Sequence, residues 1–210
     1  MDYSKFMLTI NPKAQTQLEN YKLMTGIIVP RPIALVSTVS SAGARNLAPF
    51  SFFTGVGSNP PTLCFCPALR KDDEAGPKDT LRNIEETGEF VVNIVNEAIG
   101  EPMNLTAADV APDVDEFELA GLTPIPSDAV RPPRVAESPA QMECRLLQVI
   151  RTGNLPASGV LVLGEILRYH VREDLFDNFR IDHSRLGAIG RMAGNAYVRT
   201  QDRFDLIRPK

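Results

Sequence analysis

The sequence of 210 residues contains no tryptophan, only three cysteines and only two histidines. An odd and small number of cysteines argues against a disulfide framework and for a reducing compartment. Cys64 and Cys66 are two residues apart, so on a strand both would point to the same face. Only His170, His183 and the distant Cys144 could complete a metal site around them. We therefore interpret the cysteines as packed free thiols, with no metal.

An excess of positive charge and long apolar runs are also missing. The chain has 22 Lys and Arg against 26 Asp and Glu, a net charge of −4, so it lacks the basic field of a nucleic-acid binder. No apolar run approaches the roughly 20 residues of a membrane span, and the first ten residues lack a signal-peptide core. These absences predict a soluble cytoplasmic protein without nucleic-acid or membrane partners.

Common nucleotide and hydrolase motifs are absent as well. Residues 55–57, Gly-Val-Gly, begin like a dinucleotide fingerprint, but Pro60 occupies the position of its third glycine. The sequence contains no Gly-Lys-Ser/Thr phosphate loop, no paired-histidine zinc helix and no Gly-x-Ser-x-Gly elbow. The missing motifs argue against a hydrolase.

The pattern of elements favours a mainly β fold. Asn11 and Pro12 predict a helix over residues 13–21 that ends at Gly26, and further helices are predicted over 78–87 and 97–108. Six strands are predicted, and most of them are joined by hairpin-sized loops: residues 33–40, 46–56, 62–66, 89–95, 141–151 and 159–171. We predict an antiparallel β-barrel with a few covering helices.

The length predicts one domain spanning residues 1–210. Within it, residues 109–139 are rich in proline and acidic side chains. We interpret this stretch as a loop excursion that packs on the domain, because Phe117, Leu119 and Leu122 interrupt it.

The strand over residues 31–38 ends in two hydroxyl side chains, Ser37 and Thr38. Such hydroxyls can donate hydrogen bonds to a phosphate or a ribityl chain. They are equally ordinary residues for a strand end or a turn, so this segment alone indicates little.

Residues 46–53, Asn-Leu-Ala-Pro-Phe-Ser-Phe-Phe, are more informative. Pro49 cannot donate to a β-ladder, so it interrupts or edges the strand. Ala48 and Ser51 are small enough for a flat ring to approach, and the phenylalanines supply apolar walls. A core strand with a proline at the sheet edge would explain the same pattern.

A third segment opens the predicted helix at residue 78. Lys78 and Thr80 at a helix start are typical of an anion site, because the first N–H groups are unpaired and the dipole favours negative charge. Ordinary capping by Asp79 or Thr80 is the alternative.

Taken in this order, the three segments resemble the flavin reductase-like, FMN-binding split-barrel family, in its flavoredoxin-type branch. The resemblance includes Gly-Glu-Phe-Val-Val-Asn at residues 88–93. It runs strongly over residues 29–95 and resumes at 159–170 and 186–197. It implies a split β-barrel with a few covering helices that binds FMN, and a homodimer.

The resemblance also implies roles for individual residues. Ser37, Thr38 and Asn46 would lie near the ribityl-phosphate arm, and residues 48–53 would line the isoalloxazine ring, mainly through backbone groups. Lys78 and Thr80 would contact the phosphate, with Asp79 supporting the loop, and Arg191 could neutralise the phosphate of its own or a partner subunit. The full set of implied cofactor-binding residues is Ser37, Thr38, Asn46, Leu47, Ala48, Ser51, Phe52, Phe53, Lys78, Asp79, Thr80, Arg191 and Tyr197.

No catalytic side chain is implied, because the flavin itself carries the chemistry. His170 could lie on the nicotinamide side, although a histidine at a strand end is more often structural, and His183 has no implied role.

Three functions stay open. The first is an oxidoreductase in which NAD(P)H reduces FMN by hydride transfer to the flavin N5 and the electrons pass onward to an acceptor, which could be a protein. The second is an FMN-binding electron-transfer module without NAD(P)H turnover of its own. The third is a split barrel that has lost its cofactor or holds haem.

Overall fold

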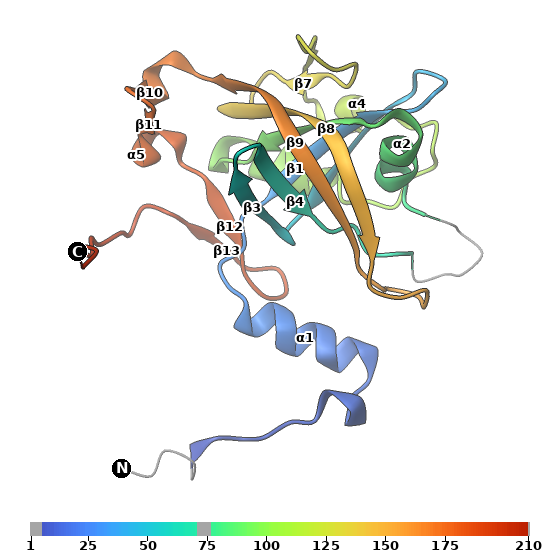
Figure 1. Ribbon diagram of the computed structural model, residues 1–210, viewed down its shortest axis with the longest axis vertical. Helices are drawn as coiled ribbons and strands as arrows, with labels where there is room; N and C mark the ends of the chain where they lie inside the picture. The colour runs from blue at the N-terminus through green and yellow to red at the C-terminus, as the bar shows by residue number, and fades with distance from the viewer. Residues whose placement is uncertain (1–5, 71–76, 210) are drawn as a thin grey trace.

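The computed structural model describes residues 6–70 and 77–209. Its centre is a seven-stranded antiparallel sheet (Figure 1). In spatial order the strands are β2 (Arg45–Phe50), β1 (Ala34–Val39), β5 (Glu89–Ile94), β8 (Ala140–Arg151), β9 (Val160–Val171), β4 (Pro61–Phe65) and β3 (Phe53–Ser58). The expected hairpin between β1 and β2 is present, with Ala34 opposite Phe50 and Val39 opposite Arg45.

The sheet curls into a barrel because its two edge strands, β2 and β3, are consecutive in the chain. Only Ser51 and Phe52 separate them. The predicted single strand over residues 46–56 is therefore wrong: the chain leaves one edge after Phe50 and enters the opposite edge at Phe53. The ring of Phe50 on β2 lies 5.1 Å from that of Phe65 on β4, across the barrel interior. The interior also holds Ala34, Val36, Phe90, Val92 and Val162.

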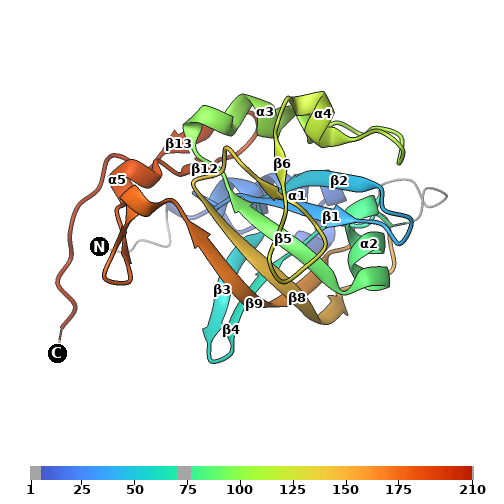
Figure 2. The same ribbon diagram turned by 90° about the horizontal axis from the view of Figure 1, so that it is seen from above.

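Strand β1 lies between two hydrophobic cores. Ala34 and Val36 face the barrel interior, whereas Leu35 faces a second core outside the barrel. The helices α3 (Gly100–Leu105) and α4 (Glu116–Ala120) cover this outer face (Figure 2), together with the short strands β6 (Pro124–Ile125) and β7 (Arg134–Val135). The proline-rich segment thus supplies part of a core layer, with Phe117 and Leu122 buried in it and Leu119 exposed.

Helix α2 (Asp79–Thr87) closes the barrel on another side. Leu81 and Ile84 project from it into the interior core. It ends at Gly88, whose φ of 73° is the left-handed conformation that glycine adopts without strain.

The first predicted helix is shifted along the chain. Asn11 and Pro12 open only a 3₁₀ turn, η2 (Pro12–Ala14), while α1 spans Gln17–Ile27. A capping box between Thr16 and Glu19 starts α1 at this later position. The helix continues through Gly26, since a glycine in the last turn costs only about 1 kcal/mol.

The helix predicted over residues 97–108 is shorter, consisting of η4 (Glu97–Ile99) and α3. After β9 the chain forms a series of small elements: η5 (Glu173–Leu175), β10 (Phe176–Asp177), β11 (Arg180–Ile181), α5 (His183–Leu186), β12 (Ile189–Arg191) and β13 (Tyr197–Arg199). Among the described residues, no helix has the length and apolar character to cross a membrane.

Candidate functional site

A cluster of buried polar side chains joins β1, β2 and α2. The Asn46 side-chain amide donates to the hydroxyls of Thr38, at 3.1 Å, and Thr80, at 3.0 Å. The Asn83 amide donates to the same Thr38 hydroxyl at 3.1 Å. The fold therefore brings together three residues that the sequence predicted as cofactor ligands, and it adds Asn83 to them.

Two buried polar atoms beside this cluster have no hydrogen-bond partner among the described residues. They are the side-chain oxygen of Asn83 and the Nε of Arg70. Buried polar atoms are nearly always paired, so each of these unpaired atoms indicates room for a polar ligand or water beside it. Arg70 also forms ion pairs with Asp79, at 3.1 Å, and Asp109, at 2.7 Å.

The start of α2 has the features of an anion site. Lys78 is the N-cap residue and makes no side-chain capping bond to the helix, so the first-turn N–H groups are not capped by its side chain. Asp79 is held between the guanidinium groups of Arg70 and Arg82. This carboxylate thus ties Arg70 to the start of α2, while Lys78 adds positive charge to the positive end of the helix dipole.

Ser37 and Leu47 point to the other face of the β1–β2 hairpin. The Ser37 hydroxyl donates to the carbonyl of Pro133, and Leu47 is buried in the outer core. The Leu47 N–H, on the open edge of β2, donates to the Glu116 carboxylate at 3.0 Å. Burial raises the pKa of Glu116, assisted by nearby Asp79 and Asp115 and opposed by that N–H. The side chains of Ser37 and Leu47 therefore do not join the Thr38 cluster.

The residues predicted to line a flat ring run from the middle of β2 to the first residue of β3. Ala48 and Phe53 are partly buried against the interior core. Arg31 contacts the junction between the strands: its Nε lies 3.4 Å from the Ser51 hydroxyl, and its guanidinium lies 5.9 Å from the centre of the Phe52 ring. These residues form the second half of the candidate site.

The hairpin of β12 and β13 is attached to this second half. Arg31 and Arg191 exchange two backbone hydrogen bonds, of 3.0 and 2.8 Å. The Arg191 guanidinium stacks on Tyr197 at 4.5 Å from the ring centre and donates to the Tyr197 hydroxyl. Both side chains line a groove of about 980 Å³ against α3, with Glu97, Asn104, Leu105, Asn195 and Arg199 among its walls.

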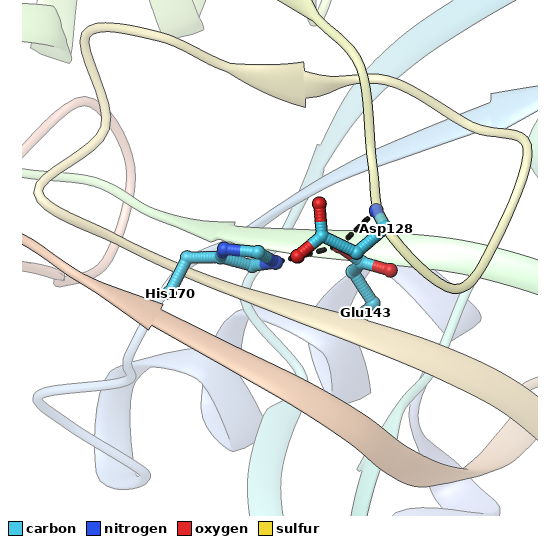
Figure 3. A group of neighbouring side chains, drawn as sticks. All are labelled: Asp128, Glu143 and His170. Carbon is cyan, nitrogen blue, oxygen red and sulfur yellow. Dashed lines mark hydrogen bonds and ion pairs between the residues drawn. The ribbon is translucent and has the colours of Figure 1, made fainter.

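His170 belongs to a different cluster, shown in Figure 3. Its Nε2 lies 2.6 Å from a carboxylate oxygen of the fully buried Glu143. The backbone N–H groups of Asp128 and Ala129 donate to the same carboxylate at 2.8 and 2.6 Å, and Arg134 lies 4.0 Å away. Glu143 therefore fastens the proline-rich segment to β8, and His170 has a structural partner. His183 lies at the exposed start of α5.

Four residues that organise these regions had no predicted ligand role: Arg31, Asn83, Glu116 and Glu143. Asn83 had a usable signal, because it lies three residues after Thr80 on a predicted helix and so shares its face. Arg31 stands before a proline at a strand start, which indicates no contact by itself. Glu116 and Glu143 lie far along the chain from the groups they bind, and no local pattern marks them.

A family model described as flavin reductase like domain matches residues 25–190. The chain belongs to this family. A nitrilotriacetate monooxygenase component B from Bacillus cereus is similar in structure, with 42% identity, a TM-score of 0.90, and coverage of 95% of this chain and 98% of that one. The 2-nitrobenzoate 2-nitroreductase NbaA of Pseudomonas fluorescens has 35% identity, a TM-score of 0.85 and 96% coverage of both chains.

A Shewanella frigidimarina protein with a split barrel domain matches in fold, at 23% identity and a TM-score of 0.83, over 97% of this chain and 100% of that one. Together with family membership, it confirms the predicted mainly β split barrel.

The Glu143 carboxylate makes the free energy of unfolding depend on pH. Burial acts to raise the pKa of this carboxyl, but the N–H groups of Asp128 and Ala129 and the His170 ring outweigh it and hold the pKa below the ordinary 4.5. A carboxyl group whose pKa is lower in the folded than in the unfolded protein stabilises the folded state. This stabilisation is complete above the pKa of the unfolded state and is lost as the pH falls through the pKa of the folded state.

We therefore expect the free energy of unfolding to fall as the pH drops from about 5 to about 3, as measured by urea denaturation. Glu143→Gln should cost about 1–3 kcal/mol at neutral pH and flatten this dependence. Glu101→Gln, on the exposed surface of α3, is the control and should behave like the wild type. An unchanged acid profile in Glu143→Gln would contradict the assignment.

Proposed function

We propose that this member of the flavin reductase like family is an FMN-binding oxidoreductase that accepts electrons from NAD(P)H and passes them onward. The observation that carries the proposal is the presence of polar groups at both ends of edge strand β2. Asn46 is the second residue of β2, and Ser51 directly follows its last residue, Phe50. An elongated ligand with a phosphate at one end and a flat ring at the other matches this spacing.

The donor set also suits FMN. At the α2 end, Lys78, Thr80 and the orphan Nε of Arg70 provide positive charge and hydrogen-bond donors for a phosphate. Thr38 and Asn46 provide polar groups for a ribityl chain. At the other end, Ala48, Ser51, Phe52 and Phe53 present small and aromatic surfaces for a ring.

When bound, FMN would supply the redox chemistry, by accepting a hydride at its N5 atom from the nicotinamide. The protein would bind, orient and shield the ring. Among the described residues the site contains no side chain arranged as a nucleophile with its base, and this chemistry requires none. The similarity to a monooxygenase component B favours transfer of the electrons to a separate acceptor, whereas the similarity to a nitroreductase favours direct reduction of an organic substrate.

An absorption spectrum and an anaerobic titration test the proposal. After incubation with FMN and removal of free flavin, we expect about one FMN per chain, and bleaching of its visible band by NADH or NADPH. Reduction by dithionite but by neither nicotinamide would indicate an electron-transfer module. A protein that retains no FMN would contradict the proposal and leave the cofactor-free or haem-binding alternative.

Lys78→Ala should weaken FMN binding by about ten- to a hundredfold, because a charged hydrogen bond to a phosphate contributes roughly 1.5–3 kcal/mol. Riboflavin lacks the phosphate, so its affinity should hardly change. Lys22→Ala, an exposed lysine on α1, is the matched control. Fluorescence titration of both flavins measures the effect. Equal losses for FMN and riboflavin would show a damaged fold instead, and no loss for FMN would exclude Lys78 from the site.

We also propose that the protein is a homodimer. Helix α1 extends away from the barrel (Figure 1), and large apolar side chains are exposed on it and on the C-terminal segments, with Ile27 at 76%, Phe179 at 90% and Ile207 at 96%. Exposed apolar surface on this scale typically marks an interface. Sedimentation velocity should therefore give twice the 23.1 kDa mass of one chain, and Ile27→Glu should shift the protein toward that single-chain mass. A wild-type monomer would contradict this expectation.

A further inference from the structure

Arg31 is a buried cation without an anionic partner. Only 5% of the residue is exposed, and no carboxylate among the described residues lies within ion-pair distance of it. Buried charges are normally paired with an opposite charge. The charge of Arg31 is therefore available to act on a group that occupies the neighbouring site.

Backbone carbonyl groups hold the guanidinium in place. One terminal nitrogen donates to the carbonyls of Thr25, at 2.8 Å, and Ile28, at 2.7 Å, and the other donates to that of Met192 at 2.9 Å. Thr25 and Ile28 lie in the last turn and at the C-cap of α1, where the negative end of the helix dipole favours a cation. These contacts fix the position of the guanidinium but leave its net charge uncompensated.

The Arg31 charge is directed at the junction between β2 and β3. Its Nε–H donates to the Ser51 hydroxyl oxygen at 3.4 Å, the one hydrogen bond of this hydroxyl among the described residues. A hydroxyl that accepts from a cation has its own proton free to donate. Ser51 therefore presents a polarised O–H donor beside the Phe52 ring.

Arg191 adds a second positive charge to that of Arg31. Arg191 is bound to Arg31 through the backbone, and its guanidinium contacts the Tyr197 hydroxyl and the Gly194 carbonyl, with no carboxylate partner among the described residues. Burial lowers the pKa of Arg31, and repulsion by Arg191 adds to this, opposed by Tyr21. An arginine nevertheless stays protonated at neutral pH. This end of the candidate site is therefore electropositive.

We propose that Arg31 is an electrostatic positioning residue that stabilises the reduced flavin relative to the oxidised flavin, in part through Ser51. The inference rests on the proposed function. The oxidised ring is neutral; uptake of two electrons and one proton leaves a reduced ring with one negative charge. A fixed positive charge in a partly desolvated site lowers the free energy of that charged form and not of the neutral one.

The test compares Arg31→Gln with Arg31→Lys. The oxidised-state dissociation constant is measured by FMN titration, and the midpoint potential by anaerobic reduction with dithionite against a reference dye. Both variants lose the guanidinium hydrogen bonds to the carbonyls of Thr25, Ile28 and Met192, which hold this end of the site in place. Both should therefore bind oxidised FMN less tightly. Only Arg31→Gln loses the charge, so its preference for reduced over oxidised flavin should fall about ten- to a hundredfold, a decrease of about 30–60 mV in the potential.

Arg134→Gln is the control, because Arg134 is a partly buried arginine on β7, in the cluster around Glu143. It should leave the potential unchanged. Equal potentials for the wild type and a folded Arg31→Gln would overturn the proposal. A decrease in Arg31→Lys as large as that in Arg31→Gln would overturn it too, since geometry and not charge would then be responsible.

Ser51→Ala covers the case in which Arg31→Gln fails to fold, because it keeps Arg31 and removes only the hydroxyl. We expect it to lower the preference for reduced flavin two- to tenfold, and an unchanged preference would overturn the proposal. Failure of the wild type to bind FMN would instead contradict the proposed function, and the inference with it. The two failures are therefore distinguishable.

Discussion

The edge strands β2 and β3 come together in the barrel without forming a ladder with each other, and much of the structure follows from this split. Each has a hydrogen-bonded neighbour on one side only. Unpaired edge groups must be satisfied in other ways. Pro49 has no N–H to satisfy, and the Leu47 N–H is capped by Glu116. The candidate site lies along this split, where side chains and not a neighbouring strand form hydrogen bonds with the backbone.

The layer that covers the outer face of the barrel gives successive residues of β1 different surroundings. Because α3, α4 and the proline-rich segment bury the outer face of β1, successive residues of this strand serve two different cores. Thr38 joins the polar cluster at α2, whereas Ser37 is bonded to the proline-rich segment. Two adjacent hydroxyls that look equivalent in the sequence thus have different environments.

Buried charges fasten irregular segments to the sheet, and in each case backbone groups solvate them. Glu143 accepts from N–H groups of the proline-rich segment, and Glu116 accepts from the edge of β2. Arg31 donates to carbonyls at the end of α1 and in the loop after β12. Charge-assisted hydrogen bonds of this kind are stronger than neutral ones. They add to the apolar contacts that hold these segments on the barrel.

Local patterns were sufficient for most of the elements. Alternation and β-branching located β1, β4, β5, β8 and β9 to within a residue or two, and the glycine after α2 marked its end. The structure also brings together Thr38, Asn46 and Thr80, whose role as cofactor ligands is implied by the resemblance and stays a prediction. The start of α1 was misplaced because the Asn11 and Pro12 signal competes with the capping box at Thr16, and the box prevails.

The strand content and the helix at residue 78 follow from local sequence patterns alone. Contacts between distant segments, by contrast, make the run from Asn46 cross between opposite sheet edges and separate Ser37 from Thr38. The same contacts give Arg31, Asn83, Glu116 and Glu143 their roles. The physical reason is that propensity and periodicity act between near neighbours in the chain. The partner of a buried charge or of an edge N–H is chosen by packing between segments tens of residues apart, as with Leu47 and Glu116.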